Sequence, residues 1–318
     1  MRFSFDDDQL AFRDTVRDLL AKECTPDVIR AAWAAEVLDR GVWDQLAEMG
    51  VLGILAPEAA GGMGLDERWL VLLLEECGYA GLPHPIVETA AVAMPLVADR
   101  VEPNALITTD LGGPLVPAAA DADQLLVADG AAGLVLVAGP DVVIEEAEVV
   151  DRGRRAGRVA WEPSVVSGVA GDRDLAFDRG AWGAAAFLVG LGQRMLDITV
   201  EYVKEREQFG VPIGSFQAVK HHLADAALQL AFARPAVERA AWSLAVGDEH
   251  RSRDVSMAKA MASDAVRLVG RKALQCHGAI GYTEEADLHL FLKRSWALQR
   301  TWGDADWHRD RIGRALGI

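Results

Sequence analysis

The segment between Met195 and Asp225 constrains the fold most, because a helical pattern stops within it once and then resumes. Before the break, apolar side chains recur every three or four residues, as on one helix face: Leu188, Leu191, Met195, Ile198 and Tyr202. Gly210, Pro212 and Gly214 then favour a tight, exposed turn. Ser215 is a good N-cap residue for a second helix. The segment therefore predicts a hairpin of two helices.

The connector of this hairpin carries four side chains suited to binding, namely Arg206, Gln208, Phe209 and Gln217. A guanidinium binds phosphate oxygens through paired hydrogen bonds, an amide reads hydrogen-bonding edges, and a phenyl ring offers a stacking face. Such connectors are also common in helical bundles, so the residues alone leave open an ordinary loop with a solvated arginine.

The string REQFGVPIGSFQAVKHHLAD, residues 206–225, resembles the C-terminal signature of the acyl-CoA dehydrogenase family, R-x-x-F-G-x-x-I-x-x-x-Q-x-x-x-x-x-L-A-D. In that family the loop reaches across a dimer interface to the FAD of the neighbouring subunit. RKALQCHGAIG matches a second FAD-contacting loop of the family, although Ala279 replaces its second glycine. The resemblance implies six FAD-binding residues: Arg206, Gln208, Phe209, Gln217, Gln275 and Gly278.

Residues 1–105 are predicted to form an N-terminal helical domain. Apolar spacing from Phe5 to Leu20 indicates an amphipathic first helix, and Asp6–Asp8 suit its positive N-terminal end. Glycines and Pro57 mark turns ahead of a buried helix from Glu67 to Cys77. This part also resembles the family, whose N-terminal domain carries a similar glycine pattern, and we interpret the glycines as structural.

Residues 106–172 contain short apolar runs that are typical of strands: DQLLVADG, GLVLVAG, DVVIEEAEVV and GRVAWEP. They resemble a shortened form of the family's central β-domain. The T-E-P-x-A-G-S-D and W-x-x-x-G-x-K segments that hold the flavin ring in relatives are missing, and LITTDLGGPLVPAAAD occupies the first place. We therefore expect a β-domain that does not hold an isoalloxazine ring from its own side.

Residues 173–318 are predicted to form a C-terminal four-helix bundle with short connections. The expected helices are Ala184–Lys204, Ser215–Ala245, Ser252–Leu274 and about Leu288–Thr301, followed by a tail to Ile318. The three parts together predict a mainly α fold with a small β-domain, like that of acyl-CoA dehydrogenases.

The family's reaction removes a proton from the carbon alpha to a thioester while a hydride passes from the beta carbon to flavin N5. The proton step needs a glutamate held against the substrate, and relatives place it at one of two positions. Counted without gaps from Gln275, the first position is Trp302. Counted back from Arg206, the second is Gly180. The neighbouring arginine of relatives falls on Ala181, and Arg179 stands in for that arginine only if the register slips by one. Both positions lack a carboxylate, so we assign no catalytic residue to this chain.

Asp304 and Asp306 are the alternative carboxylates near the first position. Both lie past the expected place and are one methylene shorter than Glu, so solvation or ion pairs with Arg300 or Arg309 are the favoured interpretation. No metal site is expected, because no ligand spacing with Cys or carboxylates is formed by His221, His222, His277 and His308.

Charge and composition exclude some partners. The net charge of −16 argues against nucleic acid, which needs a basic surface, whereas a CoA thioester needs only a local cationic patch. There is no apolar run of about 18 residues and no signal-like start, so we expect a cytoplasmic protein without membrane insertion. The three scattered cysteines predict no disulfide framework.

The retained FAD loops and the missing base predict a subunit that works beside a different, complete chain. It resembles the smaller subunit of the heteromeric α2β2 acyl-CoA dehydrogenases of actinobacteria, which act on CoA thioesters of steroid side chains. The resemblance implies a partner that carries the glutamate and most of the acyl-CoA site, with FAD shared at the interface. Two alternatives stay open: a self-sufficient homomer that uses Asp304 or Asp306, and a non-catalytic scaffold.

Overall fold

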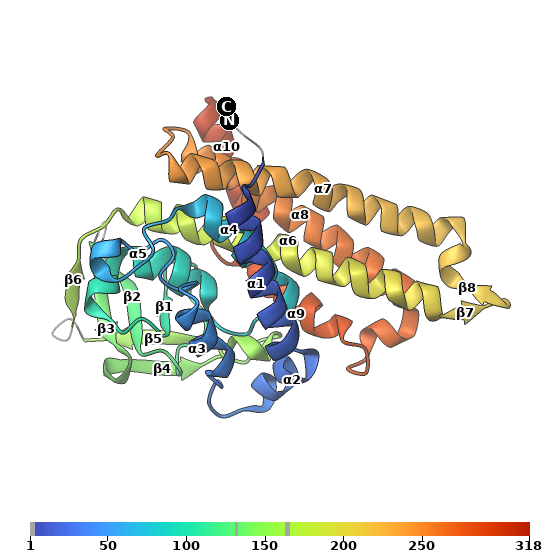
Figure 1. Ribbon diagram of the computed structural model, residues 1–318, viewed down its shortest axis with the longest axis horizontal. Coiled ribbons are helices and arrows are strands. Elements are labelled where there is room, and N and C mark those ends of the chain that lie inside the picture. The colour runs from blue at the N-terminus through green and yellow to red at the C-terminus, as the bar shows by residue number, and fades with distance from the viewer. Residues whose placement is uncertain (1–3, 131–132, 163–165) are drawn as a thin grey trace.

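The computed structural model describes residues 4–130, 133–162 and 166–318, so residues 1–3 and the end of the GRVAWEP run lie outside the described part. Helices near the N-terminus, a small group of strands and a bundle of long helices follow one another along the chain (Figure 1). This arrangement confirms the predicted fold class.

The N-terminal helices are α1 (Asp7–Glu23), α2 (Pro26–Ala34), α3 (Gly41–Glu48), α4 (Glu67–Ala80) and α5 (Met94–Val97), with the short helices η1 (Glu58–Ala60), η2 (Val87–Ala93) and η3 (Ala98–Arg100). Helix α1 begins at Asp7 because the side chains of Asp6 and Gln9 form a reciprocal capping box with the backbone of its first turn. Helix α4 runs past the predicted end at Cys77 and stops at Gly81, which adopts a φ of +71°. Element η2 is a π-helix, a conformation that is often found at functional sites.

The strands between the N-terminal helices and the bundle form two sheets in the described residues. One has the order β1-β2-β3-β6, with β1 parallel to β2 and the other pairs antiparallel, and the second is the antiparallel pair β4-β5. Their bounds are β1 (Ile107–Thr109), β2 (Gln124–Asp129), β3 (Gly133–Ala138), β4 (Val142–Glu146), β5 (Gly157–Trp161) and β6 (Ser167–Val169), with η4 (Gly139–Asp141) and η5 (Arg152–Arg154) between them. The four predicted runs correspond to β2 to β5. Strands β1 and β6 have three residues each, too few to show an alternating pattern.

The bundle contains α6 (Arg173–Glu205), α7 (Gln217–Ala245), α8 (Arg251–His277), α9 (Leu288–Arg300) and α10 (Ala305–Leu316), with β7 (Glu207–Gln208), β8 (Val211–Pro212), η7 (Ile213–Ser215) and η8 (Gly278–Tyr282) in the connections. The predicted start of the first helix at Ala184 was wrong. Helix α6 begins at Arg173 because the Asp172 side chain accepts hydrogen bonds from two backbone N–H groups of its first turn. The expected tail is helix α10.

The predicted N-cap at Ser215 was also wrong. Its hydroxyl donates to the Pro212 carbonyl at 2.7 Å and so closes the turn before the helix. Helix α7 begins at Gln217, with Phe216 at the N-cap position and no side-chain cap. The connector that precedes it folds as a small β-hairpin, β7-β8, at one end of the bundle (Figure 1).

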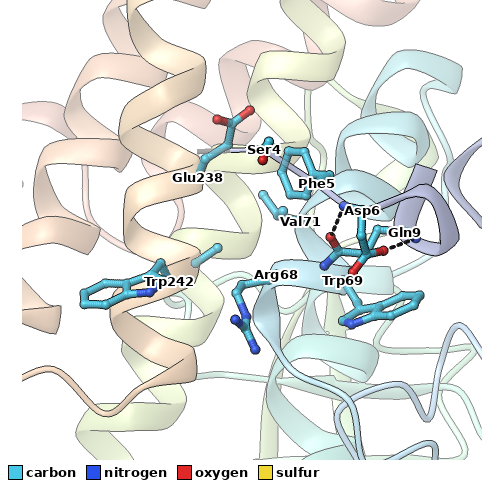
Figure 2. Close-up of a pocket in the computed structure, with 10 residues that line it drawn as sticks. Ser4, Phe5, Asp6, Gln9, Arg68, Trp69, Val71, Glu238 and Trp242 are labelled. Atoms are coloured by element: carbon cyan, nitrogen blue, oxygen red, sulfur yellow. Dashed lines mark hydrogen bonds between the residues drawn. The ribbon is translucent and has the colours of Figure 1, made fainter. Parts of the chain in front are cut away.

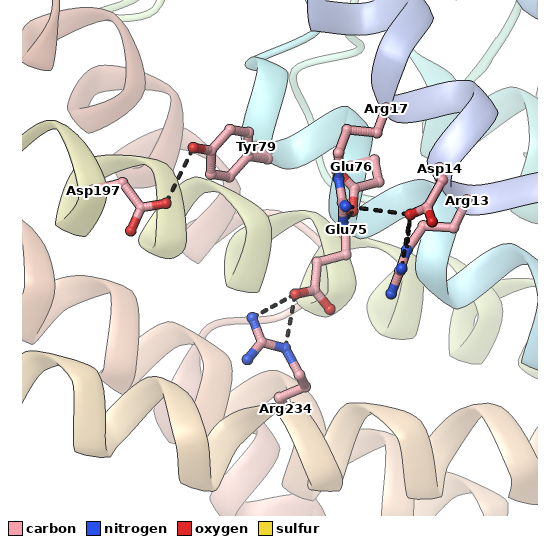
Figure 3. Close-up of polar contacts among 8 residues, drawn as sticks. All are labelled: Arg13, Asp14, Arg17, Glu75, Glu76, Tyr79, Asp197 and Arg234. Carbon is pink, nitrogen blue, oxygen red and sulfur yellow. Dashed lines mark hydrogen bonds and ion pairs between the residues drawn. The ribbon is translucent and has the colours of Figure 1, made fainter. Parts of the chain in front are cut away.

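Helices α4 and α6 approach each other closely because glycine lies at their crossing. A Cβ on Gly78 would meet the Phe187 carbonyl oxygen at 2.1 Å, and one on Gly190 would meet the Glu75 carbonyl oxygen at 2.0 Å. Polar contacts add to this packing. Figure 3 shows adjacent carboxylates of α4 paired with arginines on two other helices, Glu76 with Arg17 of α1 and Glu75 with Arg234 of α7. The N-terminal helices are therefore joined to the bundle.

Candidate functional site

The β7-β8 hairpin presents an aromatic side chain to solvent in a strained backbone conformation. Phe209 and Gly210 form its two-residue turn with φ angles of +57° and +78°, as in a type I′ turn. A bulky residue with positive φ costs about 1–3 kcal/mol. Phe209 is 93% exposed, and its ring makes an edge contact with the ring of Phe216. The Phe209 ring therefore lies exposed at the tip of the hairpin.

Arg206 stands at the base of the same hairpin, immediately after α6. Its backbone is held by hydrogen bonds to Tyr202 and Ile213, but its exposed guanidinium has no ion pair or hydrogen bond within the described residues. Gln208 donates from its amide to the neighbouring Glu207 carbonyl at 2.8 Å, and Gln217 is exposed at the start of α7. The four connector residues are thus close in the chain and open to solvent.

The second predicted loop lies at the C-terminal end of α8. Gln275 is exposed on the last turn, and Gly278 adopts a φ of +64° with no atom within 4 Å of the position of a Cβ. His277 stacks on Tyr202 with ring centroids 4.3 Å apart, which joins this loop to the end of α6. The structure therefore brings both predicted loops to one end of the bundle (Figure 1).

The two positions to which the sequence maps the base of relatives, Trp302 and Gly180, contact each other. Trp302 is fully buried, and a Cβ added to Gly180 would lie 2.3 Å from Cζ3 of its ring. Gly112, in the segment LITTDLGGPLVPAAAD, is also close, with its Cβ position 2.7 Å from Cε2 of the same ring. The indole therefore occupies the space between these two glycines, and any larger residue at either would clash with it.

Hydrogen bonds hold the loop between α9 and α10, which carries Trp302, so that the indole stays in this space. The Trp302 backbone N–H donates to the Gly112 carbonyl at 2.7 Å, and its carbonyl accepts from His308 Nε2 at 2.8 Å. The buried Lys259 ammonium donates to the Gly303 carbonyl at 3.0 Å. Burial lowers the pKa of Lys259 to about 7, and burial followed by the Lys259 charge lowers the pKa of His308 to about 3. His308 is therefore neutral, with its proton on Nε2.

Glu88 is a carboxylate near this site that sequence reasoning missed. It lies in η2, and burial raises its pKa, while the Arg154 charge and the nearby Trp302 indole lower it. The adjoining cavity has a volume of only about 20 Å³, room for one water, far below the size of sites for organic ligands. The available signal was an acidic residue within the apolar run PIVETAAVAM.

The other candidate carboxylates are engaged elsewhere. Asp304 accepts a hydrogen bond from the Trp307 backbone N–H at 2.9 Å and so caps α10, and the exposed Asp306 pairs with Arg309 at 2.7 Å. Arg179 pairs with Glu67 at 2.7 Å. Asp304 and Asp306 both line a surface hollow of about 330 Å³, where Arg300 and Arg309 also lie.

A separate hollow of about 310 Å³ lies between α1, α4 and α7. Figure 2 shows Trp69 and Trp242 on opposite sides of Arg68, with Phe5 and Glu238 at the far rim. None of the six predicted FAD-binding residues lines it. Within the described ranges, there is no cluster of three potential metal ligands and no helix long and apolar enough to cross a membrane.

Family models match two parts of the chain: "Acyl-CoA dehydrogenase, N-terminal domain" over residues 6–99 and "Acyl-CoA dehydrogenase, C-terminal domain" over residues 173–317. The acyl-CoA dehydrogenase IpdE2 of Mycolicibacterium smegmatis is 34% identical over 89% of this chain and 90% of its own length. A variant of the Tcur3481-Tcur3483 steroid ACAD superposes with a TM-score of 0.84 at 26% identity, covering 98% of each chain.

One chain in the crystal structure of the ChsE4-ChsE5 complex from Mycobacterium tuberculosis also has a similar fold, with a TM-score of 0.87 at 24% identity, covering 100% of this chain and 99% of the other. These matches span nearly the whole chain and include both loops at the end of the bundle. The chain belongs to the acyl-CoA dehydrogenase family of FAD-dependent oxidoreductases.

Proposed function

We propose that this chain is the subunit of a heteromeric acyl-CoA dehydrogenase that completes the partner's FAD site and lacks a catalytic base of its own. One contrast carries the proposal: the predicted FAD loops at the end of the bundle are exposed to solvent, whereas the space at the mapped base positions is filled by a side chain. Arg206 and Phe209 are exposed at the end, whereas Trp302 fills the space beside Gly180. A chain built in this way contributes to a flavin site only together with another chain.

The exposed loops suit the ADP half of FAD. The Arg206 guanidinium, without an internal partner in the described residues, binds a diphosphate through paired hydrogen bonds. Phe209 offers an apolar face, the amides of Gln208, Gln217 and Gln275 donate and accept hydrogen bonds, and Gly278 leaves its backbone accessible. When bound, FAD accepts the hydride from the beta carbon of the thioester.

The partner in this proposal is a complete acyl-CoA dehydrogenase subunit in an α2β2 heterotetramer. It supplies the glutamate, the contacts to the flavin ring and most of the acyl-CoA site. The cavity of about 20 Å³ beside Glu88 supports this division, because it has no room for an acyl chain. Relatives described as a steroid ACAD and as a two-protein complex make a steroid side-chain CoA ester the proposed substrate class.

The test compares this chain alone with the chain co-expressed with a complete dehydrogenase subunit. We expect FAD in the co-purified complex, at about two molecules per four chains, and none in the single chain. Arg206→Ala in the complex lowers the FAD content, whereas Arg314→Ala, an exposed arginine of α10, leaves it unchanged.

Two results would reject the proposal in favour of the alternatives. A single chain that is yellow and reduces its own flavin with an acyl-CoA supports the self-sufficient homomer, with Asp304 or Asp306 as base. A complex that retains full FAD with Arg206→Ala supports the non-catalytic scaffold.

A further inference from the structure

We propose that Lys272 of α8 and His222 of α7 form a second contact to the ADP half of the partner's FAD. Neither residue belongs to the six that the sequence predicts. The inference rests on the proposed function. It assigns a role to a cluster of side chains to which the proposed function gives none.

The hydrogen bonds of this cluster define its protonation. Lys272 Nζ lies 2.9 Å from His222 Nδ1 and 3.3 Å from Asp225 Oδ2. A lysine ammonium has donors only, so His222 Nδ1 must be the acceptor. The imidazole is therefore neutral, and its single ring hydrogen is on Nε2.

The cluster retains two unused donors. An ammonium has three N–H groups, and two of them are directed at His222 and Asp225, which leaves one. The Nε2–H of His222 has no acceptor within the described residues. Two donors on adjoining side chains, one of them charged, suit an anionic group rich in oxygen acceptors, such as a phosphate with its ribose.

The position of the cluster places it next to the predicted loops. Lys272 precedes Gln275 by three residues and therefore lies on the same face of α8. His222 follows Gln217 by five residues, about 7.5 Å along α7 at 1.5 Å per residue. The side chain of Lys272 is only 22% exposed, so packing between the two helices holds it in place before a ligand binds.

The experiment measures FAD binding to the flavin-stripped heteromeric complex by quenching of flavin fluorescence, and ADP binding by competition. A charged contact of this kind is worth about 10- to 100-fold in affinity and a neutral one about 2- to 10-fold. Lys272→Met should therefore weaken FAD and ADP binding by the first factor, and His222→Phe by the second. Lys220→Met is the control, because Lys220 lies two residues from His222 on another face of α7. Lys272→Arg should restore most of the loss.

The variants separate this inference from the proposed function. If Arg206→Ala weakens FAD binding but Lys272→Met and His222→Phe change neither FAD nor ADP affinity, only the present inference is overturned. If Arg206→Ala also has no effect, the proposed function fails. A purely structural role for Lys272 would also overturn the inference. In that case Lys272→Met would lower the melting temperature of the apo complex and leave ADP competition unchanged, and Lys272→Arg would not restore the melting temperature.

Discussion

The contact between Gly180 and Trp302 makes a quantitative prediction that a double-mutant cycle can test. A methyl group on Gly180 would lie 2.3 Å from Cζ3 of a fully buried indole, well inside van der Waals contact. Overpacking of this kind costs about 1–3 kcal/mol, more than the roughly 1 kcal/mol that alanine gains over glycine in a helix. We therefore expect Gly180→Ala to lower the free energy of unfolding.

The second arm of the cycle is Trp302→Ala, which empties the same space. Removing a buried tryptophan costs about 3–5 kcal/mol. In the Trp302→Ala background, however, the methyl group of Gly180→Ala meets no indole, and its gain in helix propensity remains. The double variant should therefore be more stable than the sum of the single changes by about 1–3 kcal/mol, and as stable as Trp302→Ala alone or slightly more so.

The assay is urea unfolding of the purified variants, followed by circular dichroism. Gly192→Ala is the matched control in α6, because its Cβ would meet Leu230 at 2.6 Å and not Trp302. Combined with Trp302→Ala, this control should be additive within about 0.5 kcal/mol. If the Gly180 cycle is equally additive, the two positions do not share one space, and the closed base position would have to be explained differently.

Three further outcomes follow from single side chains. Burial, with the Lys259 charge, lowers the pKa of His308 from its ordinary value of 6.5 to about 3, so the unfolded chain binds more protons between these values. Stability should therefore fall on acidification through that window, by at most about 1.4 kcal/mol per pH unit, and pH-dependent unfolding of His308→Gln should show a shallower slope. Asp304→Ala removes the cap of α10 and should cost about 1 kcal/mol in urea unfolding, while flavin reduction by acyl-CoA in the complex is unchanged; a loss of that reduction would identify Asp304 as the base. Phe209→Gly relieves a positive φ and should stabilise the isolated chain by up to about 1 kcal/mol, yet weaken FAD binding to the complex; unchanged FAD affinity would contradict a role for the phenyl ring.

The sequence by itself determined those features that are encoded locally. The hairpin of two helices follows from apolar spacing and from the break at Gly210 and Pro212, and neither needs information from distant residues. The two signature loops are likewise continuous strings, which is why family membership and fold class were predictable. Helix caps and very short strands were less predictable from the sequence. The cap of α6 at Asp172 and the three-residue strand β1 each depend on a few hydrogen bonds, which leave no periodic pattern.

The tertiary structure alone decided how the two positions mapped for the base lie relative to each other. The sequence shows a tryptophan at one mapped position and a glycine at the other, and it gives no sign that the two positions are in contact. Only the packing of α6 against the loop after α9 reveals that Trp302 fills the space above Gly180, with Glu88 buried nearby. The physical reason is that volume is shared among residues far apart in the chain, whereas a sequence pattern records only the neighbours along one element.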